Sequence, residues 1–337
     1  MRSRFAWAML VVALLALTAC APAASHTLAV RPPVPAVLGA HNDTSTPFKL
    51  VSLPALIEHE YDGRALRLDH VIAEELAFTR YHITYRSGDL RIGGVMNVPT
   101  RPGRHPVLVL AHGYLEPADY RNGAGLVREQ AYLATNGFVV LHPDYRNYGD
   151  SDREQAERVA APLGYPEDVV NAVRALRKAD LPFADTSRIG LFGRSMGGGV
   201  ALDALVARPD LVDAAVLYSP VSSLAADNFD RWVRGNDLHR DLEKRVVDTY
   251  GSPEDNPGFW RRASARNYLD RVDVPVQIHH GTADPICPVR WSEATAAALR
   301  DAGKDVRLFE YPGQLHRFDS AWPALMRRTV EFFRTRL

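Results

Sequence analysis

The stretch RIGLFGRSMGGGVALD, residues 188–203, decides the fold, because it joins a strand-like apolar run to a helix-like one through a serine and several glycines. Gly193, Ser195 and Gly197 form a Gly-x-Ser-x-Gly pattern at the junction. A strand-to-helix turn of this kind holds its central residue in a strained conformation that exposes the side chain. The residues two before and two after must be tiny, because their Cβ atoms would collide. We therefore predict a turn that presents the Ser195 hydroxyl, with a helix beginning at Met196.

Short apolar runs alternate with helical patterns on both sides of this turn. Strands are expected over 105–110, 138–141, 189–192, 214–218, 276–279 and 306–311, and helices over 126–135, 167–178, 196–206, 291–299 and 324–333. Such alternation is typical of βαβ units, so we predict an α/β fold with a mostly parallel central sheet and helices on both faces. A hairpin over 76–98, turning at 87–89, adds antiparallel strands at one edge.

The alternation stops over about residues 221–270, where we expect a small helical insertion. This segment carries the aromatic residues Phe229, Trp232, Tyr250, Phe259 and Trp260. Aromatic side chains bury large areas wherever they can. They form either the private core of the insertion or part of a substrate pocket, for which Phe229 and Trp232 are the candidates.

A serine hydroxyl becomes a nucleophile when a base takes its proton, and a carboxylate must hold that base in one tautomer. His316, in the loop after the last predicted strand, is the candidate base. Asp284 ends the preceding strand, where Pro285 blocks further pairing, and is the candidate acid. Asp319 is its main rival. With Ser195, these residues follow strand ends, where reactive groups of parallel sheets gather.

The loop after the strand over 105–110 also faces this edge. We expect the backbone N–H groups of Tyr114 and Met196 to form an oxyanion hole, and His112 to brace the loop. Arg146, in the loop after the strand over 138–141, either binds a substrate carboxylate or braces its own loop.

Several other polar residues are interpreted as structural. His279 and His280 lie inside a strand and are expected to be core histidines with satisfied hydrogen bonds. Asp273 and Asp305 precede strands and belong at the opposite edge of the sheet. Ser151 lies in a Gly-Asp-Ser triplet that opens another catalytic-serine signature, but it follows an interior strand and is discounted.

Composition excludes some functions. Lys and Arg total 40, as do Asp and Glu, so the formal net charge is zero. A dedicated nucleic-acid-binding protein would carry a basic excess. No His, Cys or Asp spacing fits a metal site, and no metal or cofactor is expected.

The N-terminal residues read as an export signal. Arg2 and Arg4 precede an apolar run over 5–17 that is too short for a membrane span. The run ends in LTAC, which resembles the lipobox of bacterial lipoproteins and predicts lipid on Cys20. Cys287, the other cysteine of the chain, then has no partner and is expected to be a buried, inert thiol.

These features predict a lipoprotein-type signal peptide over 1–20, a proline-rich tether over 21–47 and a catalytic domain over 48–337. The expected location is the bacterial cell envelope, with the N-terminal lipid in a membrane. The alternative is cleavage after Ala21 or Ala23, which gives a secreted or periplasmic protein.

With these residues in hand, the chain from about Ile92 to Arg334 resembles the α/β-hydrolase superfamily. Within it, the chain is similar to the catalytic domain of the prolyl oligopeptidase family and its stand-alone esterase relatives. The matching segments are HPVLVLAHGY, HPDYRNYGDSD, PEDVVNAVRAL, RIGLFGRSMGGGVAL, YGSPEDNP…SARNYLDRVDVP, PVQIHHGTADPICPV and VRLFEYPGQLHRF. The resemblance implies an α/β-hydrolase fold with Ser195 as nucleophile, Asp284 as acid and His316 as base.

Two features differ from the large peptidases of that family. Those peptidases carry an N-terminal β-propeller, for which the residues before the hairpin leave no room, and usually an aromatic residue beside the serine, where this chain has Arg194 and Met196. We therefore predict hydrolysis of a small-molecule carboxylic ester through an acyl-enzyme. The alternatives are a peptidase or aminoacyl hydrolase acting on short peptides and, ranked lower, a surface-tethered binding protein with a vestigial site.

Overall fold

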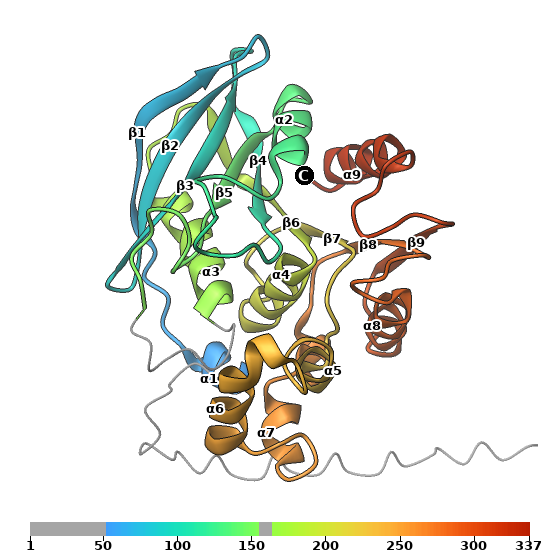
Figure 1. The fold of residues 1–337 in the computed structure, drawn as a ribbon. Coiled ribbons are helices and arrows are strands. Elements are labelled where there is room, and N and C mark those ends of the chain that lie inside the picture. Colours follow the sequence, from blue (N-terminus) through green and yellow to red (C-terminus); the bar gives the residue numbers. More distant parts are fainter. Residues whose placement is uncertain (1–51, 155–163) are drawn as a thin grey trace, which may run out of the picture. The chain divides into compact units, whose positions relative to one another are not determined.

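The computed structural model describes residues 52–154 and 164–337. The predicted signal peptide, with Cys20, and the predicted tether lie outside the described residues. The described part is built on a nine-stranded sheet of order β1-β2-β3-β5-β4-β6-β7-β8-β9 (Figure 1). No helix within 52–154 or 164–337 is long and apolar enough to cross a membrane.

The strands are β1 (Arg64–Glu74), β2 (Phe78–Ser87), β3 (Leu90–Pro99), β4 (His105–Ala111), β5 (Val139–Pro143), β6 (Ala184–Arg194), β7 (Ala214–Tyr218), β8 (Val276–Gly281) and β9 (Val306–Tyr311). The α-helices are α1 (Leu53–Glu58), α2 (Val127–Thr135), α3 (Gly164–Lys178), α4 (Met196–Ala207), α5 (Ala225–Trp232), α6 (Arg240–Tyr250), α7 (Pro257–Arg262), α8 (Val289–Asp301) and α9 (Trp322–Arg336). Two 3₁₀ helices, η2 (Asp237–His239) and η3 (Ala265–Arg271), lie in the connection between β7 and β8.

The pairing confirms the predicted mostly parallel sheet. Strands β4 to β9 all run in the same direction, whereas the pairs β1–β2, β2–β3 and β3–β5 are antiparallel. The hairpin expected over 76–98 is β2–β3, but β1 extends it by an eleven-residue edge strand that we did not predict. Most β1 side chains are exposed, so the strand lacks the alternating pattern by which half-buried strands are found.

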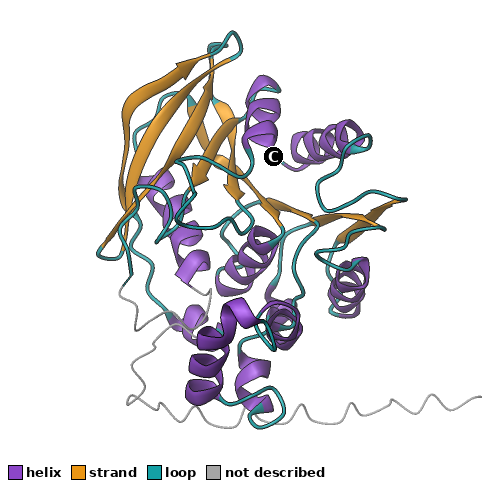
Figure 2. Cartoon of the chain, viewed as in Figure 1, coloured by secondary structure: helices purple, strands orange, loops and turns teal. Residues whose placement is uncertain are grey.

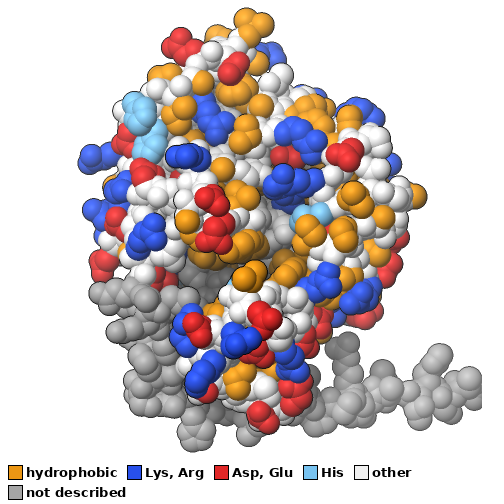
Figure 3. All heavy atoms as spheres, in the orientation of Figure 1, with side chains coloured by type: hydrophobic (Ala, Val, Ile, Leu, Met, Phe, Trp, Pro, Cys, Tyr) orange, Lys and Arg blue, Asp and Glu red, His pale blue; other side chains and the backbone are white. Residues whose placement is uncertain are grey.

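Helices cover both faces of the sheet, as predicted (Figure 1). On one face α2 contacts α9, and these two helices pack on β3, β5, β7 and β8. On the other face α3 and α4 pack against each other, and η3 links α4 to α8. Two separate hydrophobic clusters fill the two layers. On the viewed surface, side chains of both charge signs are interspersed, as the zero net charge suggests (Figure 3).

The interruption predicted after β7 contains the short helices α5, α6 and α7, coloured purple at the bottom of Figure 2. Phe229, Val246, Tyr250, Phe259 and Trp260 form a buried cluster of their own. The aromatic residues of the insertion thus mainly supply its private core, because a small helical unit needs an apolar centre of its own.

Candidate active site

Ser195 lies at the junction of β6 and α4, as the glycine pattern predicts. Its backbone has φ 58° and ψ −123°, a region that residues with a side chain rarely adopt. The strain is maintained by the surroundings: the Ser195 N–H donates to the carbonyl of Tyr218 at the end of β7, at 3.0 Å. The Ser195 side chain is half-buried, so the turn presents it at the sheet edge without enclosing it.

The flanking glycines clear the space that this turn needs. A Cβ on Gly193 would lie 2.2 Å from the carbonyl oxygen of Gly197, and a Cβ on Gly197 would lie 2.0 Å from that of Ala111. Real Cβ atoms do not approach backbone oxygens so closely. The close approach of α4 to β4 and β6 therefore requires glycine at both positions.

Asp284 and His316 lie together in the loops that follow β8 and β9. The Asp284 Oδ2 atom is 2.7 Å from His316 Nδ1. The other carboxylate oxygen, Oδ1, accepts hydrogen bonds from the N–H groups of Ile286 at 2.8 Å and Cys287 at 3.0 Å. Burial alone would raise the pKa of Asp284, but hydrogen bonds from His280, His316 and the Ile286 backbone hold it well below its usual value.

Cys287 joins this pair to the nucleophile. Its N–H donates to Asp284 Oδ1, and its thiol lies near enough to the Ser195 side chain for that group to lower the thiol pKa against the larger effect of burial. Because β6, β8 and β9 run in the same direction, their carboxyl ends bring Ser195, Asp284 and His316 to one edge of the sheet. Burial raises the pKa of Cys287 to about 12, so the thiol is neutral at ordinary pH.

The loop after β4 passes directly beside Ser195. A Cβ placed on Gly113 would be 3.1 Å from the Ser195 Cβ and 3.6 Å from its Oγ. The backbone at Gly113, the residue before Tyr114, therefore borders the space next to the hydroxyl. Met196 is the first residue of α4, and N–H groups of a first helical turn have no intrahelical acceptor. Both predicted oxyanion donors thus lie on the segments that flank Ser195.

His112 braces the β4 loop, as predicted. It is fully buried, with Nδ1 2.7 Å from the Gly113 carbonyl oxygen and Nε2 3.0 Å from that of Asp144. Burial lowers the pKa of His112 to about 4. The ring is therefore a neutral link between two loops at the sheet edge.

Arg146 is held in a buried ion-pair network rather than presented to a ligand. Its guanidinium is 2.7 Å from oxygens of Asp168 and of Glu167 and 3.2 Å from Glu154, and the side chain is 4% exposed. Of the two roles considered for Arg146, the structure favours the brace over the substrate-binding residue. The other pocket candidates, Phe229 and Trp232, also lie within packed aromatic groups: Phe229 belongs to the insertion core, and Trp232 stands edge-on to Trp291 with ring centroids 5.6 Å apart.

The rival residues have other partners. Asp319 is exposed, and its N–H bonds Gln314 Oε1 at 3.2 Å. Asp273 and Asp305, which precede β8 and β9, pair with Lys304 and Arg336. Ser151 is buried and accepts a hydrogen bond from the N–H of Gly93 at 3.0 Å. Only Asp284, among these carboxylates of the described chain, makes an ion pair with His316.

The sequence reasoning missed several side chains around the three residues. His280, assigned to the core, is buried but also lies 3.2 Å from Asp284 Oδ2. Arg194 is buried and donates to the Gly125 carbonyl at 2.6 Å, which ties the nucleophile turn to the loop before α2. The available signal was that Arg194 adjoins Ser195 and that His280 precedes Asp284 by four residues, but a role in the site depends on side-chain direction, which the pattern does not give.

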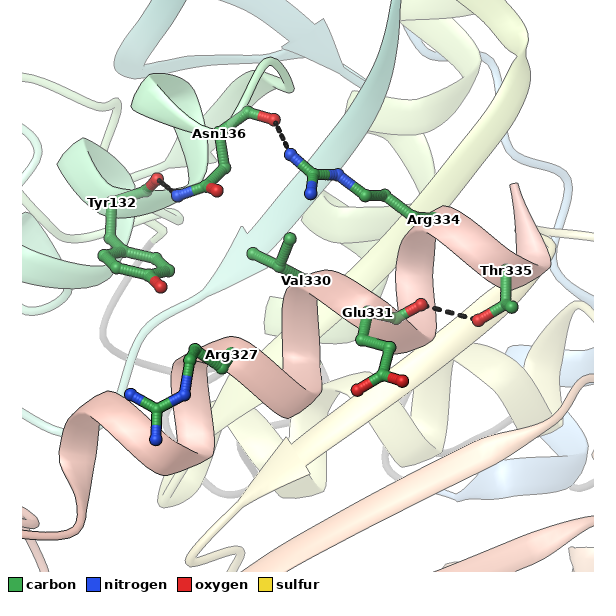
Figure 4. Close-up of a pocket in the computed structure, with 7 residues that line it drawn as sticks. All are labelled: Tyr132, Asn136, Arg327, Val330, Glu331, Arg334 and Thr335. Carbon is green, nitrogen blue, oxygen red and sulfur yellow. Dashed lines mark hydrogen bonds between the residues drawn. The ribbon is translucent and has the colours of Figure 1, made fainter.

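A surface hollow of about 340 Å³ between α2 and α9 lies elsewhere (Figure 4). Its lining residues are Tyr132, Asn136, Arg327, Val330, Glu331, Arg334 and Thr335. It borders the C-terminal turns of both helices, which lie at the sheet edge opposite Ser195, because helices of a parallel sheet begin at its carboxyl edge.

Comparison with known proteins identifies the family to which the chain belongs. The model of the "Prolyl oligopeptidase family" matches residues 126–337. The chain is 27% identical over 240 residues to "Uncharacterized peptidase YtmA" of Bacillus subtilis, which covers 71% of this chain and 86% of the relative. It is 40% identical over 122 residues to "Esterase LipQ" of Mycobacterium tuberculosis, or 36% of this chain and 27% of the relative.

Two solved structures share the fold at low identity. The acylaminoacyl peptidase of Pyrococcus horikoshii aligns with a TM-score of 0.61 and 23% identity over 77% of this chain, which spans 42% of the peptidase. Acetyl xylan esterase 1 of Thermoanaerobacterium sp. aligns with a TM-score of 0.62 and 18% identity over 83% of this chain and 92% of the esterase. The family match covers more than half of the chain and includes all three residues at the sheet edge. The protein is therefore an α/β-hydrolase-fold serine hydrolase that belongs to the prolyl oligopeptidase family.

Proposed function

We propose that the protein hydrolyses carboxylic esters through an acyl-enzyme formed on Ser195, with His316 as the base and Asp284 as its acid partner. The observation that carries this proposal is the 2.7 Å contact of His316 Nδ1 with Asp284, at the edge where the strained turn presents Ser195. This contact directs Nδ1–H toward the carboxylate and leaves Nε2 as the proton acceptor.

In the first step the Ser195 Oγ attacks the ester carbonyl carbon while His316 Nε2 takes the hydroxyl proton. The developing oxyanion is stabilised by N–H groups of Tyr114 and Met196. Collapse of the tetrahedral intermediate breaks the bond to the alcohol, which leaves with the proton from His316. A water, deprotonated by the same nitrogen, then attacks the acyl-enzyme and releases the acid.

Two observations support an ester substrate. The acetyl xylan esterase aligns over 92% of its own length, whereas the acylaminoacyl peptidase aligns over 42% of its length. Exposed apolar side chains also lie near each part of the site: Tyr114 after β4, Ile286 after Asp284 and Leu315 before His316. Such side chains favour an apolar acyl or leaving group over a charged one.

The second candidate is a peptidase or aminoacyl hydrolase. It is favoured by the family to which the chain belongs and by the printed name of the Bacillus relative. An amide requires the same nucleophile and base, but its amine leaving group must be protonated before it departs. The three proposed catalytic residues are therefore the same for both activities, and only a measured substrate preference distinguishes an esterase from a peptidase.

A fluorophosphonate probe tests the proposed nucleophile. Wild-type protein should be labelled, and Ser195→Ala should not. Ser151→Ala, which changes the buried serine of the Gly-Asp-Ser triplet, is the matched control and should be labelled like the wild type. An unlabelled wild-type protein would refute catalysis by Ser195 and favour a binding protein with a vestigial site.

A substrate panel tests the ester proposal. Nitrophenyl esters of increasing acyl length and aminoacyl nitroanilides are compared by kcat/KM on one purified sample. We expect turnover of the esters to exceed that of every anilide. A higher kcat/KM for an anilide than for the best ester would assign the protein to the peptidases.

We also propose that the protein is exported and held at the bacterial cell envelope by lipid on Cys20. The support is the order of features in the sequence: basic residues, an apolar run over 5–17, LTAC and a proline-rich segment. A lipid anchor at the envelope would restrict the enzyme to substrates outside the cytoplasm.

A further inference from the structure

His280 occupies a position that the proposed mechanism does not use. It is the neighbour of His279 on β8, so the two side chains point to opposite faces of the sheet. His279 contacts Tyr311 and Gln277, whereas His280 lies on the side of α8. Both rings are fully buried, but only that of His280 contacts Asp284.

Three oxygen atoms lie within 3.2 Å of the His280 ring nitrogens. Nδ1 is 2.6 Å from the Ser292 hydroxyl of α8. Nε2 is 2.7 Å from the backbone carbonyl oxygen of Cys287 and 3.2 Å from Asp284 Oδ2. The ring therefore joins α8, the loop before it and the proposed catalytic acid.

These partners fix the tautomer of His280. A carbonyl oxygen only accepts hydrogen bonds, so Nε2 must carry a proton, which it shares between Cys287 O and Asp284 Oδ2. In the neutral ring Nδ1 is then an acceptor, and the Ser292 hydroxyl donates to it. His280 thus donates to the same carboxylate oxygen as His316.

We propose that His280, held by Ser292, is a positioning residue that orients Asp284 and sets the pH at which His316 acts as base. This inference rests on the proposed catalytic role of Asp284. One donor from His280 and two backbone donors leave a single direction in which the carboxylate meets His316. The N–H of His280 also draws negative charge from Oδ2 and weakens its attraction for a protonated His316.

The other groups around Asp284 leave His280 as the side chain, besides His316, that faces Oδ2. The Cys287 thiol is neutral because burial raises its pKa to about 12. Arg231, on α5, donates to the carbonyl of Pro285 and so reaches the loop rather than the carboxylate. From α8, Ser292 supplies an uncharged hydroxyl.

Three variants separate positioning from packing. His280→Leu removes the N–H while filling the space, and His280→Gln restores a donor at similar reach. His279→Leu is the matched control, because it removes an equally buried histidine of the same strand, with two hydrogen bonds, on the face away from Asp284. Ser292→Ala removes the group that fixes the tautomer and provides a milder variant should His280→Leu fail to fold.

We expect His280→Leu to lower kcat about 10- to 100-fold with little change in KM, since small misplacements of catalytic groups have effects of this size. The lower-pH limb of its kcat/KM profile should move to higher pH, because Asp284 then attracts a protonated base more strongly. Ser292→Ala should shift in the same direction by less. His280→Gln should stay near the wild type, and His279→Leu should keep the wild-type limb.

A second readout does not depend on turnover. In histidine-labelled protein, the nuclear magnetic resonance titration of the His316 ring should move to higher pH in His280→Leu and not in His279→Leu. Equal behaviour of these two variants in both measurements would overturn the role of His280. Failure of the proposed function gives a different result, namely a wild-type protein that does not react with the fluorophosphonate.

Discussion

Replacing Asp284 with asparagine preserves the size of the proposed acid, and its surroundings determine how the new amide is oriented. In the wild type Oδ1 accepts two backbone N–H groups, from Ile286 and Cys287, at 2.8 and 3.0 Å. An asparagine keeps these bonds only with its carbonyl oxygen in that position. Its NH₂ group then takes the place of Oδ2, which lies 2.7 Å from His316 Nδ1 in the wild type.

The consequence is the wrong tautomer of the base. An NH₂ group donates, so His316 Nδ1 must accept, and the ring proton moves to Nε2, where the Ser195 proton has to go. When the acid of such a triad no longer holds the base in the correct tautomer, kcat falls by about 10⁴-fold. This corresponds to about 5.4 kcal/mol in the activation barrier. We expect a reduction of that order for Asp284→Asn, with KM little changed.

The assay is kcat for the best nitrophenyl ester of the panel, with circular dichroism as the check on folding. Asp319→Asn is the control: it changes the exposed rival carboxylate and should stay within about threefold, as surface substitutions usually do. A decrease of less than tenfold in Asp284→Asn, or a large one in Asp319→Asn, would refute the assignment of the acid.

Stability should follow a defined pH dependence in the same variant. The folded-state pKa of Asp284 lies below its usual value, so the charged form stabilises the fold above about pH 4 and this contribution is lost as the pH falls through the folded-state pKa. Asp284→Asn should therefore unfold at lower temperature than the wild type near pH 7, and the difference should shrink as the pH falls below 4.

Three further changes test the architecture around the site. Gly193→Ala places a Cβ 2.2 Å from a backbone oxygen of α4 and should lower the free energy of unfolding by about 1–3 kcal/mol or more. The control is Gly258→Ala, whose Cβ meets no atom closer than 3.5 Å. This variant should unfold at nearly the wild-type denaturant concentration. Arg146→Met removes the cation that pairs with the buried carboxylate of Asp168 and should cost about 3–5 kcal/mol by urea unfolding. Arg234→Met, which breaks exposed pairs with Asp230 and Glu254, should change the midpoint little. A stable Arg146→Met protein with raised KM would favour substrate binding instead. Cys20→Ser should abolish incorporation of labelled fatty acid and release the protein from membranes, and unchanged labelling would contradict the lipoprotein prediction.

Much of the fold was predictable because its signals are local. The central strands β4, β5, β7 and β8 are short buried runs, and α3 between β5 and β6 carries the regular spacing of apolar residues. The prediction was weakest where burial is partial. Strand β1 and the short helix α1 were missed, because an exposed edge strand and a six-residue helix leave little periodicity to detect.

Some residues of the candidate site could also be predicted from the sequence, and others could not. Ser195 was identifiable from the glycines that its turn requires, and Asp284 and His316 from their places after predicted strands. Arg146 shows the limit of this reasoning. Its loop position allowed either a ligand site or a brace, and only the carboxylates of α3, brought beside it by the fold, distinguish the two.

The sequence by itself determined the strand-to-helix turn at Ser195, because the glycines stand at a set spacing on either side of the serine, although the backbone that Gly197 approaches, at Ala111, is distant in sequence. The tertiary structure alone decided which histidines matter. His279 and His280 are adjacent and both buried, yet one faces Tyr311 and the other Asp284. The physical reason is that successive side chains of a strand point to opposite faces. What lies on each face depends on β9 and α9, which are distant in sequence, and on how the loop after β8 turns α8 back against the strand.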